Sequence, residues 1–163
     1  MEPHFDEFTV VTQNIDNLHQ RAGSRNVIEL HGSILRNYCV SCSRSASEED
    51  LRNPAGDGVY RCSECGGLVR PDVVWFGEML PPGAIEAADR AAREADVFLS
   101  IGTSAVVYPA ASIPITARLN GAYVAEINVE RSAIALDLDE VIVGRAGEVL
   151  PELLAAIRTA KSR

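Results

Sequence analysis

Two pairs of cysteines constrain this chain more than any other feature of its sequence. Cys39 and Cys42 form one C-x2-C pair, Cys62 and Cys65 form the other, and the nineteen residues 43–61 separate them. This spacing is typical of zinc sites, in which two tight turns each supply two thiolates to one tetrahedral ion. Free or disulfide-paired cysteines are the alternative, but the pattern uses all four cysteines of the chain. Because the protein would fill every coordination position, we expect the zinc ion to be structural.

The sequence around the cysteines differs in composition and hydrophobic pattern from the rest of the chain. Residues 38–70 contain serines, a charged SEED run and the pair Gly66-Gly67, and their apolar residues show little periodicity. Such glycines give a metal-binding turn its backbone freedom. We therefore predict a small zinc-ribbon module over residues 38–70, inserted into a larger domain formed by residues 1–37 and 71–163.

Apolar strands and amphipathic helices alternate in that larger domain. Short runs rich in β-branched residues predict strands at residues 8–12, 27–30, 97–101, 123–127 and 141–143. Helical patterns cover residues 81–95, 110–119 and 148–160. Strands that alternate with helices and are apolar on both faces favour a parallel sheet covered on both sides. The predicted fold class is therefore α/β, with a Rossmann-like parallel sheet.

Residues with ligand-binding potential follow several of these strands. Parallel sheets bind ligands at the carboxyl ends of their strands. We expect five such positions to converge on one crevice: Asn14, His31, Gly77, Ser104 and Asn128. Of the three histidines, only His31 combines a strand end with a following glycine, which leaves room for a ligand. A purely structural role for this histidine is the alternative.

Two polar clusters stay ambiguous when their residues are read alone. The segment 12–19, TQNIDNLH, suits either a ligand site or a turn with an Asx-type cap. The segment 102–104, GTS, suits either a capped strand-to-helix turn or a backbone nest for phosphate. Asn128 and Glu130 lie where a dinucleotide-binding sheet contacts ribose, which is a weak signal by itself.

The charge of the chain argues against some classes of binding partner. A formal charge of -8 and a pI near 4.9 argue against nucleic acids and anionic membranes, because both need a basic surface. No apolar stretch reaches the roughly 18 residues that span a bilayer. Met1 is followed by acidic residues rather than by a cationic and apolar leader. We expect a cytoplasmic protein.

Several motifs together resemble the sirtuin family of NAD-dependent protein-lysine deacylases. With the two cysteine pairs, they occur in the family's order and approximate spacing: TQNIDNLHQRAG, ELHGS, GGLVRPDVVWFGE, IGTSAVVYP, AEIN and GRAGEVLPELL. Such an ordered series is far more specific than any one motif. The form GTSAVVYPAA is similar to the bacterial and mitochondrial branch that includes desuccinylases.

The resemblance implies a role for each matching residue. His31 would be the catalytic general base that acts on the ribose hydroxyls of NAD. The cofactor-binding residues would be Gln13, Asn14, Ile15, Asp16, Gly102, Thr103, Ser104, Asn128, Glu130 and Ala146. The acyl-lysine peptide would pair with a strand-like edge formed by Val74, Trp75, Phe76, Gly77 and Glu78. The zinc ligands would be Cys39, Cys42, Cys62 and Cys65.

The implied substrate is an acylated-lysine protein or peptide. Its acyl oxygen would add to the ribose carbon of NAD as nicotinamide leaves, and His31 would then help a ribose hydroxyl close onto the adduct. A histidine suits this role, because a pKa near 6.5 leaves most of it neutral and able to accept a proton at pH 7. One water would be consumed, and the products would be nicotinamide, O-acyl-ADP-ribose and free lysine.

The chain departs from the family pattern at its beginning. The family carries a glycine-rich GAGxS turn well before the TQN motif, whereas here eleven residues without glycine precede Thr12. We therefore expect a sheet truncated on its amino-terminal side, weak NAD binding by this chain and self-association through exposed strand edges. The alternative function is a catalytically inactive module that contains zinc and binds peptides.

Overall fold

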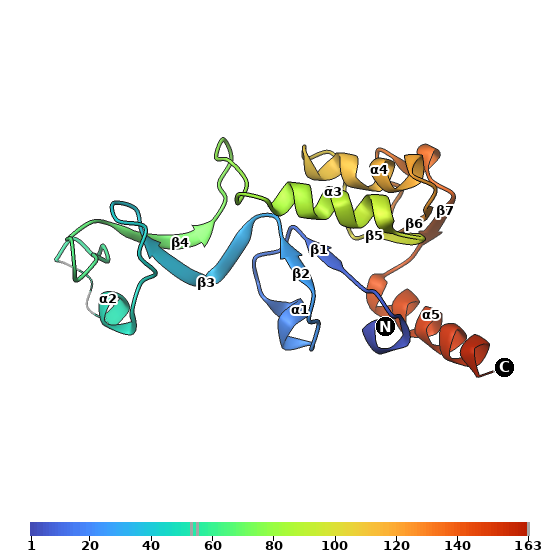
Figure 1. The fold of residues 1–163 in the computed structure, drawn as a ribbon, viewed down its shortest axis with the longest axis horizontal. Coiled ribbons are helices and arrows are strands. Elements are labelled where there is room, and N and C mark those ends of the chain that lie inside the picture. The colour runs from blue at the N-terminus through green and yellow to red at the C-terminus, as the bar shows by residue number, and fades with distance from the viewer. Residues whose placement is uncertain (53, 55, 163) are drawn as a thin grey trace. The chain divides into compact units, whose positions relative to one another are not determined.

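The computed structural model describes residues 1–52, 54 and 56–162 of the chain. The chain forms two compact units, which we call the ribbon unit (residues 10–82) and the sheet unit (residues 1–9 with 83–163). Strands and helices occur in both units (Figure 1). The predicted α/β class is therefore confirmed.

The ribbon unit begins with a short parallel strand pair. Strand β1 (Val10–Thr12) pairs with β2 (Val27–Glu29), and helix α1 (Leu18–Arg21) lies between them in the chain. Leu30, directly after β2, is fully buried. The strands predicted at residues 8–12 and 27–30 are thus present with shorter bounds.

An antiparallel ribbon extends from this pair toward the cysteines. It consists of β3 (Gly32–Cys39) and β4 (Val69–Val73), and the segment between them contains α2 (Glu48–Arg52). Gly32 opens the ribbon with a φ of +75°, and a Cβ atom there would lie 2.1 Å from the carbonyl oxygen of Asp72. Only glycine fits this close approach of two backbones.

The sheet unit contains three parallel strands in the order β5-β6-β7. Their bounds are Val97–Ile101 for β5, Tyr123–Asn128 for β6 and Glu140–Val143 for β7. The central strand β6 carries the core, because Val124 and Ile127 are fully buried. All three strands lie at or within one residue of their predicted bounds.

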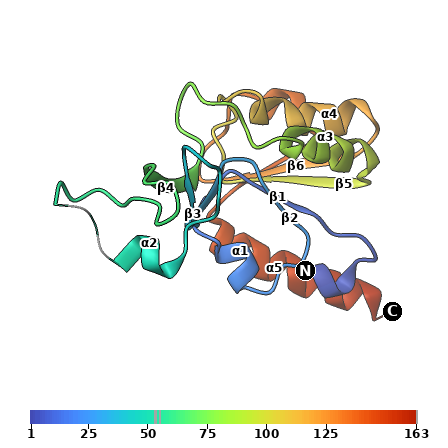
Figure 2. The same cartoon turned by 60° about the vertical axis from the view of Figure 1, so that its left-hand side comes forward.

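Helices cover both faces of this three-stranded sheet. Figures 1 and 2 show α3 (Ala84–Glu94) and α4 (Ile113–Leu119) on one side and α5 (Ala146–Lys161) on the other. Short 3-10 turns complete the unit at Glu2–His4 (η1), Ala110–Ser112 (η2) and Ala135–Asp137 (η3). Helices α3 and α4 pack against each other, and both bury alanines, whose small side chains allow close approach.

The structure differs from the sequence prediction in two respects. The parallel strands belong to two sheets, β1-β2 and β5-β6-β7, rather than to one. The β3–β4 ribbon was not predicted, because exposed Ile34 and Leu35 break the alternation of buried and exposed residues along β3. The apolar run 73–76 mostly follows β4, which ends at residue 73.

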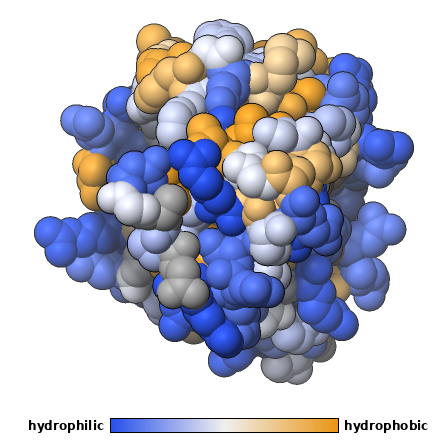
Figure 3. Space-filling model, turned by 90° about the vertical axis from the view of Figure 1, so that its left-hand side faces the viewer, coloured by the Kyte–Doolittle hydropathy of each residue, from blue (hydrophilic) through white to orange (hydrophobic). Residues whose placement is uncertain are grey.

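Among the residues that the structure describes, no helix combines the length and the apolar character that a bilayer crossing requires. On the face that Figure 3 shows, hydrophilic residues occupy much of the surface.

Candidate functional site

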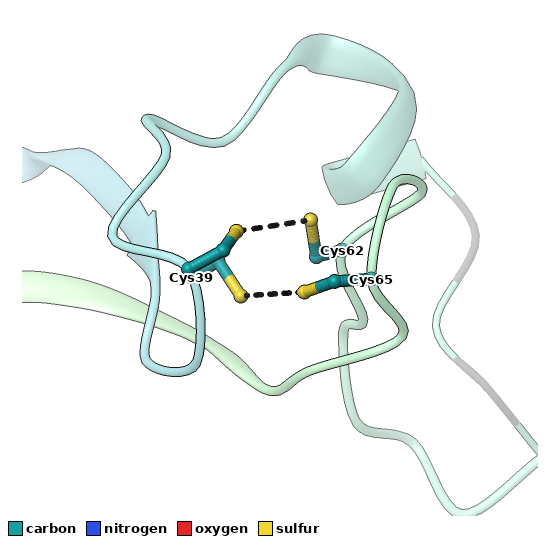
Figure 4. A group of neighbouring side chains, drawn as sticks. Cys39, Cys62 and Cys65 are labelled. Carbon is teal, nitrogen blue, oxygen red and sulfur yellow. Dashed lines mark hydrogen bonds between the residues drawn. The ribbon is translucent and has the colours of Figure 1, made fainter.

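The four cysteines form one tight cluster in the ribbon unit. All four sulfur atoms lie within 4.8 Å of one another. The Sγ atoms of Cys39 and Cys65 are 3.4 Å apart, and those of Cys42 and Cys62 are 3.9 Å apart (Figure 4). A tetrahedral zinc ion with bonds near 2.3 Å needs sulfurs roughly 3.8 Å apart. The cluster therefore fits zinc, and all four cysteines are free of disulfides.

The two cysteine pairs lie in matching turns. The residue after each pair, Ser43 or Gly66, has a left-handed backbone with φ near 59° or 72°. Its N–H donates to the carbonyl oxygen of the first cysteine of the pair, at 2.8 Å in one turn and 2.9 Å in the other. This turn directs both thiols of a pair to the same side, which is what a shared ion requires.

The surroundings of these thiols shift their pKa values in different directions. The Arg44 side chain and then the backbone N–H of Cys65 lower the pKa of Cys62 to about 6. The backbone N–H of Cys42 is the main cause that lowers the pKa of Cys39. At Cys65, the Gly67 N–H favours the thiolate, but the neighbouring sulfurs outweigh it and raise the pKa to about 12. Four thiolates in so small a volume repel one another, so full ionisation calls for a cation.

His31 lies in the turn between β2 and β3, with its ring held against the TQN segment. Its Nδ1 atom is 3.0 Å from the backbone oxygen of Gln13. Because a carbonyl oxygen only accepts, Nδ1 carries the proton in this contact. Neutral imidazole then keeps its lone pair on Nε2, which leaves that atom able to accept a proton. The structure thus brings the predicted base and one predicted cofactor residue together.

The segment after β1 is ordered by hydrogen bonds of its own. The backbone N–H of Asn14 donates to the Thr12 hydroxyl at 3.1 Å, and the Ile15 carbonyl accepts from Ile34 at 2.9 Å. Asp16 accepts from the N–H of Leu18 at 3.0 Å at the start of α1. Asp16 therefore forms the Asx-type turn of the structural alternative, while its exposed side chain still has acceptor capacity.

The predicted peptide edge forms a braced loop after β4. Arg70 makes two hydrogen bonds to the Glu78 carboxylate, and the backbone N–H of Trp75 donates to the same group at 3.0 Å. The guanidinium of Arg70 also lies 4.4 Å from the centre of the Trp75 ring. The ion pair with Arg70, followed by the Trp75 N–H, lowers the pKa of Glu78 to about 2. Phe76 is fully exposed at the tip of this loop.

In the sheet unit, Asn128 joins the loops that follow neighbouring strands. Its side-chain amide donates to the carbonyl oxygen of Thr103 at 2.9 Å, and its Oδ1 accepts from the N–H of Val129 at the same distance. Its backbone oxygen accepts from Gly144 at the end of β7. The predicted residues of this unit therefore gather at the carboxyl edge of one parallel sheet, where ligands bind in such folds.

The other predicted cofactor-binding residues of the sheet unit lie at the carboxyl edge of the sheet or in the segments that follow it. Gly102 donates its N–H to Ile127 at 3.0 Å, and the Thr103 hydroxyl accepts from the N–H of Ala105 at 3.2 Å. Glu130 is exposed in the loop after β6, and Ala146 is the first residue of α5. The expected convergence of these residues with His31 and the TQN segment stays a prediction.

Sequence reasoning missed three charged residues of the ribbon unit. Arg44 and Asp50 lie beside the cysteine cluster, and Arg70 braces the loop before Glu78. Their only signal in the sequence is the presence of a charged side chain in a cysteine-rich or glycine-rich segment. Spacing does not distinguish such residues from ordinary surface charges.

Comparison with known proteins agrees with this arrangement. The profile of the Sir2 family matches residues 1–109. The chain is 56% identical over 149 residues to NAD-dependent protein deacylase 2 of Pyrobaculum aerophilum, covering 91% of this chain and 59% of that protein. It is 50% identical over 156 residues to the NAD-dependent protein deacylase of Thermococcus kodakarensis, covering 91% and 60%. The chain thus spans about three fifths of these relatives.

Solved structures show the same likeness. A mutant Sir2 homologue in complex with 2'-O-acetyl-ADP-ribose superposes with a TM-score of 0.90 at 44% identity, covering 99% of this chain and 64% of that one. A Sir2 homologue in complex with NAD gives a TM-score of 0.89 at 44% identity, covering 98% and 61%. The chain belongs to the Sir2 family, the sirtuins.

Proposed function

We propose that this protein is an NAD-dependent protein-lysine deacylase. The observation that carries the proposal is the 3.0 Å contact between Nδ1 of His31 and the carbonyl oxygen of Gln13. Because a carbonyl oxygen only accepts, a proton on Nδ1 leaves Nε2 of the neutral ring able to accept one. The relatives named above are deacylases. One similar structure holds NAD and another holds a propionylated peptide. The proposed substrate class is therefore an acylated-lysine protein or peptide.

The predicted site residues of this chain would have separate roles in the reaction. Bound NAD supplies the ribose carbon and the nicotinamide leaving group. His31 takes a proton from a ribose hydroxyl at Nε2, and the Gln13 carbonyl steadies the imidazolium through Nδ1. The loop 74–78 offers backbone groups for pairing with an extended peptide. Residues 102–104, Asn128, Glu130 and Ala146 would bind the rest of the cofactor at the sheet edge.

The proposed domain organisation follows the sequence prediction. Residues 1–37 and 71–163 form the NAD-binding domain, and residues 38–70 form a module with one structural zinc ion. Support for the module comes from the sulfur cluster, whose dimensions fit zinc. The cytoplasmic location and self-association through strand edges stay predictions.

The branch of the family is a finer proposal. The motif GTSAVVYPAA supports a place in the branch that includes desuccinylases. Acetylated and succinylated versions of one peptide, compared by kcat/KM, test this placement. A preference for the succinyl peptide supports it, and the absence of any succinyl turnover contradicts it.

The test of the proposed function is nicotinamide release from NAD in the presence of an acyl-lysine peptide. In protein extended by a GAGxS-type segment of the family, His31→Ala should lower turnover by at least about 10²-fold, the low end for general acid–base catalysis. His4→Ala is the control, because it removes a histidine in η1 that lies outside every predicted site. Equal turnover of His31→Ala and the control would refute the role of His31. Peptide binding without any nicotinamide release by this extended protein would favour the inactive peptide-binding module.

A further inference from the structure

Two charged residues form a bridge beside the cysteine cluster. Asp50, in α2, is a buried carboxylate with an exposed fraction of 3%. The Nη2 atom of Arg44 lies 2.7 Å from the Asp50 carboxylate and 3.2 Å from the sulfur of Cys62. One guanidinium nitrogen therefore connects a buried acid to a sulfur of the cluster.

Both residues also bind the backbone of the cysteine turns. The Arg44 carbonyl oxygen accepts from the N–H of Cys39 at 2.9 Å, which ties Arg44 to the first pair. The Asp50 carboxylate accepts from the N–H of Ser63, the residue after Cys62, at 2.7 Å. Arg44 and Asp50 thus hold one cysteine pair each and hold one another.

The remaining acceptor positions of Asp50 are also used. The backbone N–H and the hydroxyl of Ser47 donate to its carboxylate at 2.6 and 2.9 Å. These bonds keep Asp50 ionised and fixed, and its pKa lies far below the usual range because of the N–H groups of Ser47 and Ser63. A fixed carboxylate in turn fixes the guanidinium, since charge-assisted bonds are the stronger and more directional kind.

The charge of a four-cysteine site explains why such a bridge matters. Four thiolates and one divalent ion leave an excess of two negative charges on the sulfurs. A cationic donor beside a sulfur offsets part of this excess and orients that ligand. Partners of this kind, one shell beyond the metal ligands, commonly change metal affinity by about 10–100-fold when they are removed.

We propose that Arg44 and Asp50 act together as positioning residues that hold the two cysteine pairs in register and retain the zinc ion. We call this pair the Arg44–Asp50 clamp. It requires zinc at the cysteines and is independent of the deacylase reaction.

Transfer of zinc from the purified full chain to a chromogenic chelator tests the clamp. Arg44→Gln should weaken zinc retention by about 10–100-fold. Arg61→Gln is the matched control, because Arg61 lies in the same segment and pairs with Asp57 on the surface. Equal retention by the two variants would overturn the proposal. Absence of zinc from the unaltered protein would instead contradict the zinc assignment itself, so the two failures are distinguishable.

A double-mutant cycle tests whether Arg44 and Asp50 act together on zinc retention. Asp50→Asn keeps the shape of the side chain and removes its charge, and it should also weaken retention. Because both residues act through one contact, the double variant should lose less than the product of the two single losses. Independent, multiplicative losses would refute joint action.

Cobalt in place of zinc gives a readout that a purely structural role would not change. Loss of the Arg44 donor makes the Cys62 thiolate easier to oxidise, so the sulfur-to-cobalt charge-transfer bands should move to lower energy. Arg61→Gln should leave these bands in place, and unmoved bands in Arg44→Gln would contradict the proposal. If Arg44→Gln does not fold, Arg44→Lys replaces it, because lysine keeps the charge without the planar fork. Retention by Arg44→Lys equal to that of Arg61→Gln would then overturn the clamp.

Discussion

The cysteine segment and the sheet unit are stabilised in different ways. In the sheet unit the buried residues are mainly aliphatic, with Val124 and Ile127 fully inaccessible in the central strand. Within the described part of residues 38–70, the buried residues are two cysteines and Asp50. Nearby apolar side chains such as Val40 are exposed. The sheet unit thus has an apolar core, whereas the cysteine segment has a polar and sulfur-rich centre.

This difference shows how a small polar module can keep a defined shape. Burial of apolar surface contributes about 25 cal/mol per Å², which gives the sheet unit a source of stability in its own side chains. A segment of some thirty residues cannot bury enough apolar surface alone. Metal binding replaces that contribution, because the free energy of binding a structural zinc ion is also folding free energy. We therefore expect the two regions to respond to different perturbations.

Removal of zinc should have the largest effect and should be confined to the cysteine segment. We expect one zinc ion per chain by elemental analysis. Binding of structural zinc is worth about 10–16 kcal/mol at pH 7 in small zinc domains, far more than the other contacts of this segment supply. A chelator should therefore abolish amide protection in residues 38–70 and leave β5, β6 and β7 protected. Hydrogen exchange resolved by peptide measures both regions in one sample.

Two outcomes would contradict this view of the cysteine segment. One is protein purified without chelator that holds no metal and has four reactive thiols. The other is equal protection of residues 38–70 before and after zinc removal.

Truncation of the apolar core should have the next largest effect. Ile127→Ala should lower the free energy of unfolding by about 2–5 kcal/mol, as for other buried aliphatic side chains. Ile34→Ala is the matched control in the ribbon unit, because Ile34 is 47% exposed. This variant should lower the free energy of unfolding by less than about 1 kcal/mol. Urea unfolding of zinc-loaded protein, followed by circular dichroism, measures both. Similar losses in the two variants would show that the sheet unit does not depend on its core in this way.

The smallest effect should be an acid transition in the loop that contains Trp75. Ionised Glu78 binds Arg70 and the Trp75 N–H, which lowers its pKa from an ordinary value near 4.5 to about 2. Because the folded-state pKa is depressed, this stabilisation is complete above about pH 4.5 and is lost as the pH falls toward about 2. Trp75 is the only tryptophan, so its fluorescence should change over this interval.

Two variants sharpen the acid test. Glu78→Gln should shift the emission at neutral pH and remove the transition, because the carboxylate that titrates is gone. Glu48→Gln removes an exposed acid that pairs with Arg52 in α2, and it should leave the transition unchanged. A transition that persists in Glu78→Gln would assign the titration to another group.

Local patterns in the sequence determined a large part of this protein. The strand at residues 97–101 has the bounds that its apolar run predicts, and the helix predicted at 110–119 ends at Leu119. The clustering of the four cysteines is also as predicted. The strand and the helix each depend on residues within one element, and the cysteine cluster follows from two short C-x2-C pairs whose nineteen-residue separation is typical of zinc sites. Neighbouring residues therefore contain the information.

The tertiary structure alone decided which distant groups meet. The pairing of β3 with β4, the contact of His31 with Gln13 and the bond from Arg44 to Cys62 each join residues at least eighteen positions apart. Periodicity does not show such pairings, because a strand or a charged side chain has the same local pattern with many different partners. The partner is selected by backbone register and by the burial of charge. Backbone register and the burial of charge depend on the whole fold, so the positioning residues could be identified only from the three-dimensional structure.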